Sequence, residues 1–212
     1  MTLRIAVSGC TGYAGGEVLR LLLQHPGVTI GNVTAKSSAG SKLGQHQPHL
    51  LPLADADVLD TTVDNLAGHD VIVLALPHGT SGEIAAQLAE ASPDSMLIDL
   101  GADHRLESAD AWTTYYGGEH PGTWTYGMPE LLLAEGAKQR DHLRTATRIA
   151  VPGCNVTAVT FALAPGIAAG LIEPTDLVAV LANGVSGAGK SLKPHLLASE
   201  IHGSASPYGV GG

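Results

Sequence analysis

A chain of 212 residues with 44% hydrophobic and 15% charged residues can bury an apolar core, which excludes an intrinsically disordered protein. The net charge of -9, without any long run of Lys and Arg, excludes nucleic acid as a partner. The N-terminal apolar segment ends at Gly9, too early for a signal peptide or a membrane span, so we expect a cytoplasmic protein with no membrane contact.

The first hundred residues alternate β-rich apolar runs with helical patterns, which is typical of a parallel sheet with helices on both faces. A helix over residues 14–24 carries an apolar stripe and stops at His25-Pro26-Gly27. The expected strands cover residues 3–8, 28–35, 70–76 and 96–100, and a second helix covers residues 82–91. The sequence therefore predicts an α/β fold built on a doubly wound, Rossmann-type parallel sheet.

A glycine-rich segment joins the first strand to the first helix, where backbone N–H groups and the helix N-terminus can bind a pyrophosphate. Its spacing, G-x-x-G-x-x-G, is looser than the usual dinucleotide fingerprint, but its position favours cofactor binding over an ordinary turn. The cofactor-binding residues that we predict here are Gly9, Thr11, Gly12, Tyr13, Ala14 and Gly15, with Pro77 at the end of another strand. His78 is expected to have a structural or capping role.

The second strand ends where an NAD-specific protein places a carboxylate for the ribose hydroxyls. Lys36, Ser37 and Ser38 stand there instead, and one cation with two hydroxyls suits a 2′-phosphate. The sequence therefore predicts NADP(H) as the cofactor rather than NAD(H), with an ordinary exposed turn as the alternative.

Residues 102–144 interrupt the alternation with a polar segment that contains Tyr and Trp between glycines and prolines. We interpret it as long, ordered loops over the strand ends, where binding groups often lie. A surface excursion with a small core of its own is an equal alternative.

The chain has two cysteines, Cys10 and Cys154, and neither has the spacing of a zinc site or a redox pair, so we expect no metal. Cys154 follows a strand over residues 148–151 and opens a helical pattern. A helix N-terminus stabilises a thiolate, and its N–H groups can hold an oxyanion, so we predict Cys154 as the catalytic nucleophile. Cys10 lies in the glycine loop and is expected to be a packing residue.

A further apolar strand is expected over residues 177–181, followed by a second glycine-rich loop that matches the letters of a P-loop. Its late position, after a first glycine loop and a cysteine turn, favours a reductase over a nucleoside triphosphatase. Ser186, Gly187, Ala188 and Gly189 are then expected to close over the nicotinamide. We place an NADP-binding domain at residues 1–151 and an incomplete α+β substrate domain at residues 152–212.

Short segments along the whole chain resemble the N-acetyl-γ-glutamyl-phosphate reductase family of arginine biosynthesis. They are SGCTGYAG (8–15), ALPHG (75–79), DLGADHR (99–105), YGMPE (126–130), PGC (152–154) and SGAG (186–189). The sequence departs from the family at Asn155-Val156, where Tyr-Pro is usual, and at Cys10. It also lacks the family's His-Arg-His-Pro-Glu segment, whose first histidine is an acid/base.

The resemblance implies that NADPH reduces an acyl phosphate, N-acetyl-L-glutamyl 5-phosphate, to the semialdehyde with release of phosphate, through a thioester on Cys154. It also implies a second domain like that of glyceraldehyde-3-phosphate dehydrogenase and a homo-oligomer at full length. Arg105 is expected to hold a substrate phosphate or carboxylate, with Asn155 as a second substrate-binding residue. An ion pair of Arg105 with Asp103 or Glu107 is an equal alternative.

Without the acid/base histidine, we expect the 212-residue chain to bind NADP(H) but to turn over poorly or not at all. Aspartate-semialdehyde dehydrogenases and the aminoadipyl-phosphate reductases of the lysine pathway share the same plan, although residues 77–79 and 103–105 favour the glutamyl enzyme. A non-catalytic NADP-binding or sensor module, with Cys154 retained only for packing, is the alternative from another class.

Overall fold

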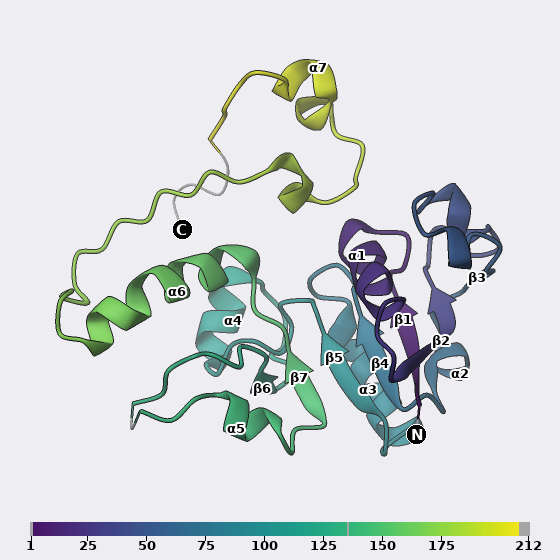
Figure 1. Ribbon diagram of the computed structural model, residues 1–212, viewed down its shortest axis with the longest axis horizontal. Helices are drawn as coiled ribbons and strands as arrows, with labels where there is room; N and C mark the ends of the chain where they lie inside the picture. Colours follow the sequence, from purple (N-terminus) through teal and green to yellow (C-terminus); the bar gives the residue numbers. More distant parts are fainter. Residues whose placement is uncertain (1, 135, 208–212) are drawn as a thin grey trace. The chain divides into compact units, whose positions relative to one another are not determined.

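The computed structural model describes residues 2–134 and 136–207, in two units, Met1–Ala179 and Val180–Gly212. The strands are β1 Leu3–Ser8, β2 Val28–Thr34, β3 Val58–Leu59, β4 Val71–Leu74, β5 Met96–Asp99, β6 Thr125–Tyr126 and β7 Arg148–Ala150. They form one seven-stranded sheet in the first unit, in the order β3-β2-β1-β4-β5-β7-β6 (Figure 1). All its neighbouring strands are parallel, which confirms the predicted Rossmann-type fold.

Helices connect most of these strands. The two helices predicted in the first half of the chain, over residues 14–24 and 82–91, are present, and each begins one residue earlier than predicted. The helices are α1 Tyr13–Leu22, α2 Val63–Leu66, α3 Ser81–Ala91, α4 Ala109–Tyr115, α5 Arg140–Leu143, α6 Cys154–Ala168 and α7 Ala198–Ile201. Short 3-10 turns are η1 Leu43–Gln45, η2 Leu51–Leu53, η3 Val185–Ala188 and η4 Pro194–Leu196. None of the helices among the described residues has the length and apolarity needed to cross a membrane.

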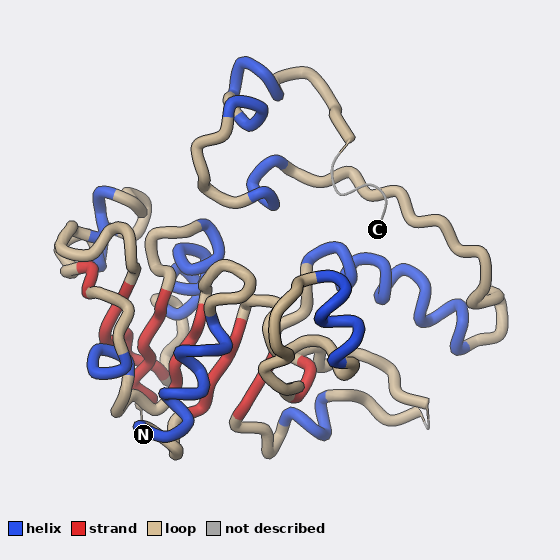
Figure 2. The backbone as a smooth tube through the Cα atoms, turned by 180° about the vertical axis from the view of Figure 1, so that it is seen from behind, coloured by secondary structure: helices blue, strands red, loops and turns tan. Residues whose placement is uncertain are grey.

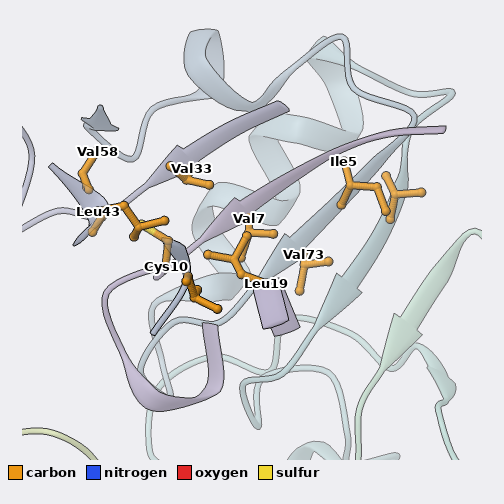
Figure 3. Packing of buried hydrophobic residues seen from close by; sticks show 11 residues of the cluster. Ile5, Val7, Cys10, Leu19, Val33, Leu43, Val58 and Val73 are labelled. Atoms are coloured by element: carbon orange, nitrogen blue, oxygen red, sulfur yellow. The ribbon is translucent and has the colours of Figure 1, made fainter. Parts of the chain in front are cut away.

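Successive side chains of a strand point to opposite faces of the sheet, and helices pack on both faces. Val7 of β1 belongs to a buried cluster with Leu19 of α1, which Figure 3 shows. Ala6, the preceding residue, belongs to a second cluster with Leu88 of α3. The red strands in Figure 2 lie side by side in one layer. Because the strands are parallel, their carboxyl ends lie along the same side of the sheet. The predicted site residues of the first unit follow these carboxyl ends.

The segment over residues 102–144 contains more regular structure than the loops that we predicted, namely α4, β6 and α5. Helix α4 starts after Ser108, whose Oγ accepts a hydrogen bond of 3.1 Å from the N–H of Ala111. Trp112 of this helix is 3% exposed and stacks on Tyr116, with 4.7 Å between the ring centroids. These elements escape sequence analysis because α4 has seven residues and β6 has two, too few to show a periodicity.

The predicted strand over residues 177–181 is wrong. These residues form no strand, and the side chains of Val178 and Val180 are 89% and 93% exposed. A strand exists only where a neighbouring strand binds its N–H and C=O groups, and no described residue pairs with this run. Apolar, β-branched composition shows that a segment suits a sheet, but it does not supply the partner.

The two units divide at Ala179 and Val180, whereas the predicted domain boundary lies before α6. The boundary at residues 151 and 152 therefore remains a prediction.

Candidate active site

The glycine loop after β1 depends on glycine at two positions. Gly9 has φ +77°, and a Cβ there would lie 2.1 Å from the carbonyl oxygen of Ala75. A Cβ on Gly15 would lie 2.2 Å from the carbonyl oxygen of Gly9. The N–H groups of Gly9 and Cys10 both donate to the carbonyl of Thr34, at 2.8 and 3.1 Å. The loop therefore packs closely against the ends of β2 and β4, and its backbone path leaves no room for a side chain at Gly9 or Gly15.

Gln47, which the sequence analysis did not single out, contacts this loop from the protein interior. It lies just after η1, is 5% exposed, and donates from Nε2 to the carbonyls of Cys10 and Gly12, at 3.0 and 2.8 Å. These partners are 37 and 35 residues away in the sequence. No local pattern indicates such a contact.

The residues predicted to read the cofactor's 2′-phosphate lie beside the loop. The hydroxyl oxygens of Ser38 and Thr11 are 3.5 Å apart. Lys36 and Ser37 are exposed just beyond the end of β2, the strand next to β1. The turn is held from behind by Ser41, whose Oγ donates to the carbonyl of Ser38 at 2.6 Å. The structure thus brings two predicted groups of cofactor residues together.

Pro77 and His78 follow β4, the neighbour of β1 on the other side. The N–H of Ala75 donates to the carbonyl of Ser8 at 2.9 Å, which keeps this strand end next to the glycine loop. The imidazole Nδ1 of His78 accepts a hydrogen bond of 3.0 Å from the N–H of Ala102. His78 therefore stabilises the backbone after β5.

Cys154 is the first residue of α6 and is exposed. The N-cap residue, Gly153, has extended backbone angles and provides no side chain to cap the helix. Asn155 is also exposed, and its Oδ1 lies 3.8 Å from the Cys154 sulfur. An accessible thiol next to the N–H groups of a helix N-terminus has the arrangement that a nucleophile and an oxyanion require.

Cys10 has the opposite environment. Its side chain is fully buried in the cluster shared by β1 and α1, and burial raises the pKa of its thiol to about 12. A thiol with this pKa stays protonated at neutral pH and is not reactive. The prediction that Cys10 is a packing residue is confirmed.

Arg105 joins the ends of β5 and β7, next to the turn that precedes Cys154. Its Nε donates to the carbonyl of Val151 and its Nη2 to the carbonyl of Leu100, both at 2.7 Å. Its Nη1 lies 3.2 Å from the position that a Cβ on Gly153 would occupy. Among the described residues it forms no ion pair. The surface ion pair is thus the wrong alternative, and the guanidinium is held beside the turn that precedes Cys154.

Replacing Arg105 with alanine is expected to lower the free energy of unfolding by about 2 to 4 kcal/mol, because two half-buried carbonyls lose a charged donor. Urea denaturation of both proteins measures the change. Arg20→Ala is the matched control, since Arg20 makes two hydrogen bonds with Glu17 on the exposed face of α1. Its loss is expected to leave the urea midpoint within error. Equal effects of the two variants would contradict the role assigned to Arg105.

A buried carboxylate pair fixes the loop that carries Arg105. Asp99 ends β5 and is fully buried, which raises the pKa of its carboxyl, while hydrogen bonds from the N–H of Gly101 and the hydroxyl of Ser81 act in the opposite direction. Asp103 accepts from the N–H groups of Gly79 and Gly82, at 2.8 and 3.0 Å. Together they join the loop after β5 to the N-terminus of α3.

The second glycine loop lies in the other unit, and its predicted role at the nicotinamide remains a prediction. Residues Val185–Ala188 form η3, and Gly189 follows with φ +85°. A P-loop needs a strand before it and a helix after it. Within residues 136–207 no strand directly precedes this loop and no helix directly follows it, so the structure does not support a P-loop of a nucleoside triphosphatase.

Two family models match the chain. One, described as the NAD binding domain of semialdehyde dehydrogenase, matches residues 4–139, and the other, described as its dimerisation domain, matches residues 154–212. Proteins named N-acetyl-gamma-glutamyl-phosphate reductase from Micrococcus luteus and Leifsonia xyli are 60% and 59% identical over all 212 residues. The chain spans 60% of the length of each of these relatives.

Solved structures with low sequence identity share the fold. Aspartate semialdehyde dehydrogenase from Francisella tularensis matches 80% of this chain and 42% of its own, with a TM-score of 0.55 and 16% identity. Aspartate semialdehyde dehydrogenase with NADP from Candida albicans matches 78% of this chain and 48% of its own, with a TM-score of 0.54 and 18% identity. At these identities the likeness supports the architecture alone.

Proposed function

Because the chain belongs to the semialdehyde dehydrogenase family, we propose that it carries the cofactor site and the nucleophile of an NADPH-dependent N-acetyl-γ-glutamyl-phosphate reductase. The observation that carries the proposal is an exposed Cys154 at the start of α6, in the same unit as a glycine loop built for a dinucleotide. The names of the relatives support the choice of N-acetyl-γ-glutamyl phosphate as the substrate in this proposal. The proposal includes a cytoplasmic location. It also includes a homo-oligomer, and the match to a dimerisation domain supports this second part.

The glycine loop fits a nicotinamide dinucleotide. The absence of a Cβ at Gly9 and Gly15 lets the backbone run close to the ends of neighbouring strands, so that a pyrophosphate can approach main-chain N–H groups at the start of α1. Lys36, Ser37 and Ser38 would hold the 2′-phosphate, and Pro77, which follows β4 next to the glycine loop, would contact the cofactor. When bound, the cofactor supplies a hydride to the substrate carbonyl carbon.

Cys154 would form and later release the covalent intermediate. Its thiolate attacks the carbonyl carbon of the acyl phosphate, a C–S bond forms, and the C–O bond to phosphate breaks, with the electron pair leaving on phosphate. The N–H groups at the start of α6 would stabilise the oxyanion. After hydride arrives at the same carbon, the C–S bond breaks and the semialdehyde leaves with the thiolate restored. Arg105, held beside Gly153, and Asn155 are the groups that we propose for the substrate's anionic parts.

The arrangement of strands supports one site for cofactor and nucleophile. The glycine loop follows β1 and the Cys154 turn follows β7, with β4 and β5 between them in the sheet. Three strand spacings separate β1 from β7, roughly 14 Å. A dinucleotide held at β1 and extended along the carboxyl edge would reach toward β7.

The cofactor proposal predicts that the chain binds NADPH at least about tenfold more tightly than NADH, because Lys36 pairs with a phosphate that NADH lacks. Fluorescence titration with each cofactor measures both dissociation constants. Lys36→Ala is expected to remove most of the difference. Lys42→Ala is the control, since Lys42 already pairs with Asp57 at 2.6 Å. Equal affinity of the unaltered chain for the two cofactors would contradict the NADP preference.

A further inference from the structure

Gln47 is the one buried amide that contacts the glycine loop in the described part of the chain. Its Nε2 carries two hydrogens, and the two carbonyls that it contacts, those of Cys10 and Gly12, lie on either side of Thr11. One side chain therefore contacts two peptide groups of the loop at once, and the Gly12 carbonyl accepts in addition from the N–H of Gly16, at 3.0 Å.

The direction of these bonds sets the direction of the loop's N–H groups. A trans peptide is planar, and its N–H points opposite to its C=O. The carbonyls of Cys10 and Gly12 point toward the buried Gln47, so the N–H groups of the same two peptides, which belong to Thr11 and Tyr13, point away from it. This is the side from which an anion would approach a loop at the start of a helix.

The surroundings of Gln47 are shaped for the amide. A Cβ on Gly16 would lie 2.3 Å from Nε2, so the absence of a side chain there opens the space that the amide fills. The backbone of Gln47 is held on both sides, because its N–H donates to the carbonyl of Leu43 and its carbonyl accepts from Leu50, at 2.9 and 3.0 Å. Leu43 and Leu50 are both buried in the core. The segment that carries the amide is therefore held in place by backbone hydrogen bonds and by buried leucines on both sides.

We propose that Gln47 is a positioning residue for the cofactor: it sets the peptide orientations of the loop that receives the pyrophosphate. The inference rests on the proposed NADP(H) site and extends it to a residue that lies outside the glycine loop. A carboxylate or an apolar side chain cannot replace it, because neither provides two donors.

The test compares Gln47→Met, which keeps similar volume without a donor, with Gln47→Glu, which places acceptor oxygens against two carbonyls. Isothermal titration of the 212-residue chain with NADPH is expected to show affinity about tenfold lower for Gln47→Met, and lower still for Gln47→Glu. Affinity for 2′-AMP, which carries the 2′-phosphate but no pyrophosphate, is expected to stay within twofold of the unaltered chain. A general loss of structure would weaken both ligands.

Two glutamines provide matched controls. Gln139 is also buried, at 8% exposed, and donates from Nε2 to the carbonyl of Tyr126 at 3.1 Å, so Gln139→Met removes a buried amide bond away from the loop. Gln45 is the last residue of η1, two residues before Gln47, and it is exposed, so Gln45→Met removes an amide at the surface. Both variants are expected to bind NADPH as the unaltered chain does. Hydrogen exchange is expected to rise in residues 10–15 for Gln47→Met and to stay unchanged there for Gln139→Met.

Each outcome decides between the claims. Unchanged NADPH affinity in both Gln47 variants, with normal binding by the unaltered chain, overturns the inference and leaves the proposed function standing. Equal losses for NADPH and 2′-AMP overturn it as well, because they show a general effect on the fold. Failure of the unaltered chain to bind NADPH overturns the proposed cofactor and this inference together.

Discussion

Iodoacetamide at pH 7 is expected to alkylate Cys154 at least about 10³ times faster than Cys10. The thiolate is the reacting form, and the pKa of about 12 at Cys10 leaves roughly one thiol in 10⁵ ionised at this pH. An ordinary cysteine thiol, with a pKa of about 8.5, is a few per cent ionised under the same conditions. Cys10 is also fully buried, whereas Cys154 is exposed at the start of α6. Mass spectrometry of the two cysteine-containing peptides over time measures both rates.

Two variants assign the rates to their residues. Cys154→Ser is expected to remove the fast alkylation and leave only the slow reaction of Cys10, while Cys10→Ala leaves the fast reaction unchanged. Comparable rates at the two cysteines would favour the alternative in which Cys154 serves packing in a non-catalytic module. For the full-length protein, the proposed mechanism also predicts that Cys154→Ser lowers kcat by several orders of magnitude, because the thiol that would form the thioester is lost.

Gly15→Ala is expected to destabilise the protein by about 3 kcal/mol or more, although alanine is normally the better helix former by about 1 kcal/mol. The new Cβ would lie 2.2 Å from the carbonyl oxygen of Gly9 and 3.0 Å from the Cα of Cys10. Both are backbone atoms, so the whole loop must move, and it is held to Thr34 by two hydrogen bonds. Thermal and urea denaturation measure the loss of stability. NADPH affinity is expected to fall at least about tenfold, because the moved loop no longer fits the pyrophosphate.

Gly12→Ala provides the comparison within the same loop. Gly12 has φ -78°, and a Cβ there would lie 3.4 Å from the carbonyl oxygen of Gly9, at the limit of an ordinary contact. Its effect on stability is expected to stay below about 1 kcal/mol, the usual cost of alanine at an N-cap. If Gly15→Ala stabilised the helix as propensity alone predicts, the close packing of the loop would be wrong.

Much of the fold could be predicted from the sequence because its signals are local. The apolar run that forms β4 has all four residues buried, as expected of a strand covered on both faces. Helix α1 starts directly after Gly12, where glycine spacing indicated a strand-to-helix turn. The position of Cys154 at the start of α6 follows equally from the strand, the turn and the helical pattern around it.

The tertiary structure alone decided which distant groups meet. Gln47 contacts a loop 35 to 37 residues away, and Arg105 bonds to a carbonyl 46 residues away, and neither contact leaves a periodic trace in the sequence. The run over residues 177–181 shows the converse, since its composition suits a strand but no strand among residues 2–134 and 136–207 pairs with it. Periodicity and turn chemistry depend on residues within a few positions, so the sequence by itself determined the Rossmann-type elements and the place of Cys154 at the start of a helix. Hydrogen bonds across the sheet edge depend on packing, so only the folded chain determined what holds the glycine loop and the Cys154 turn in place.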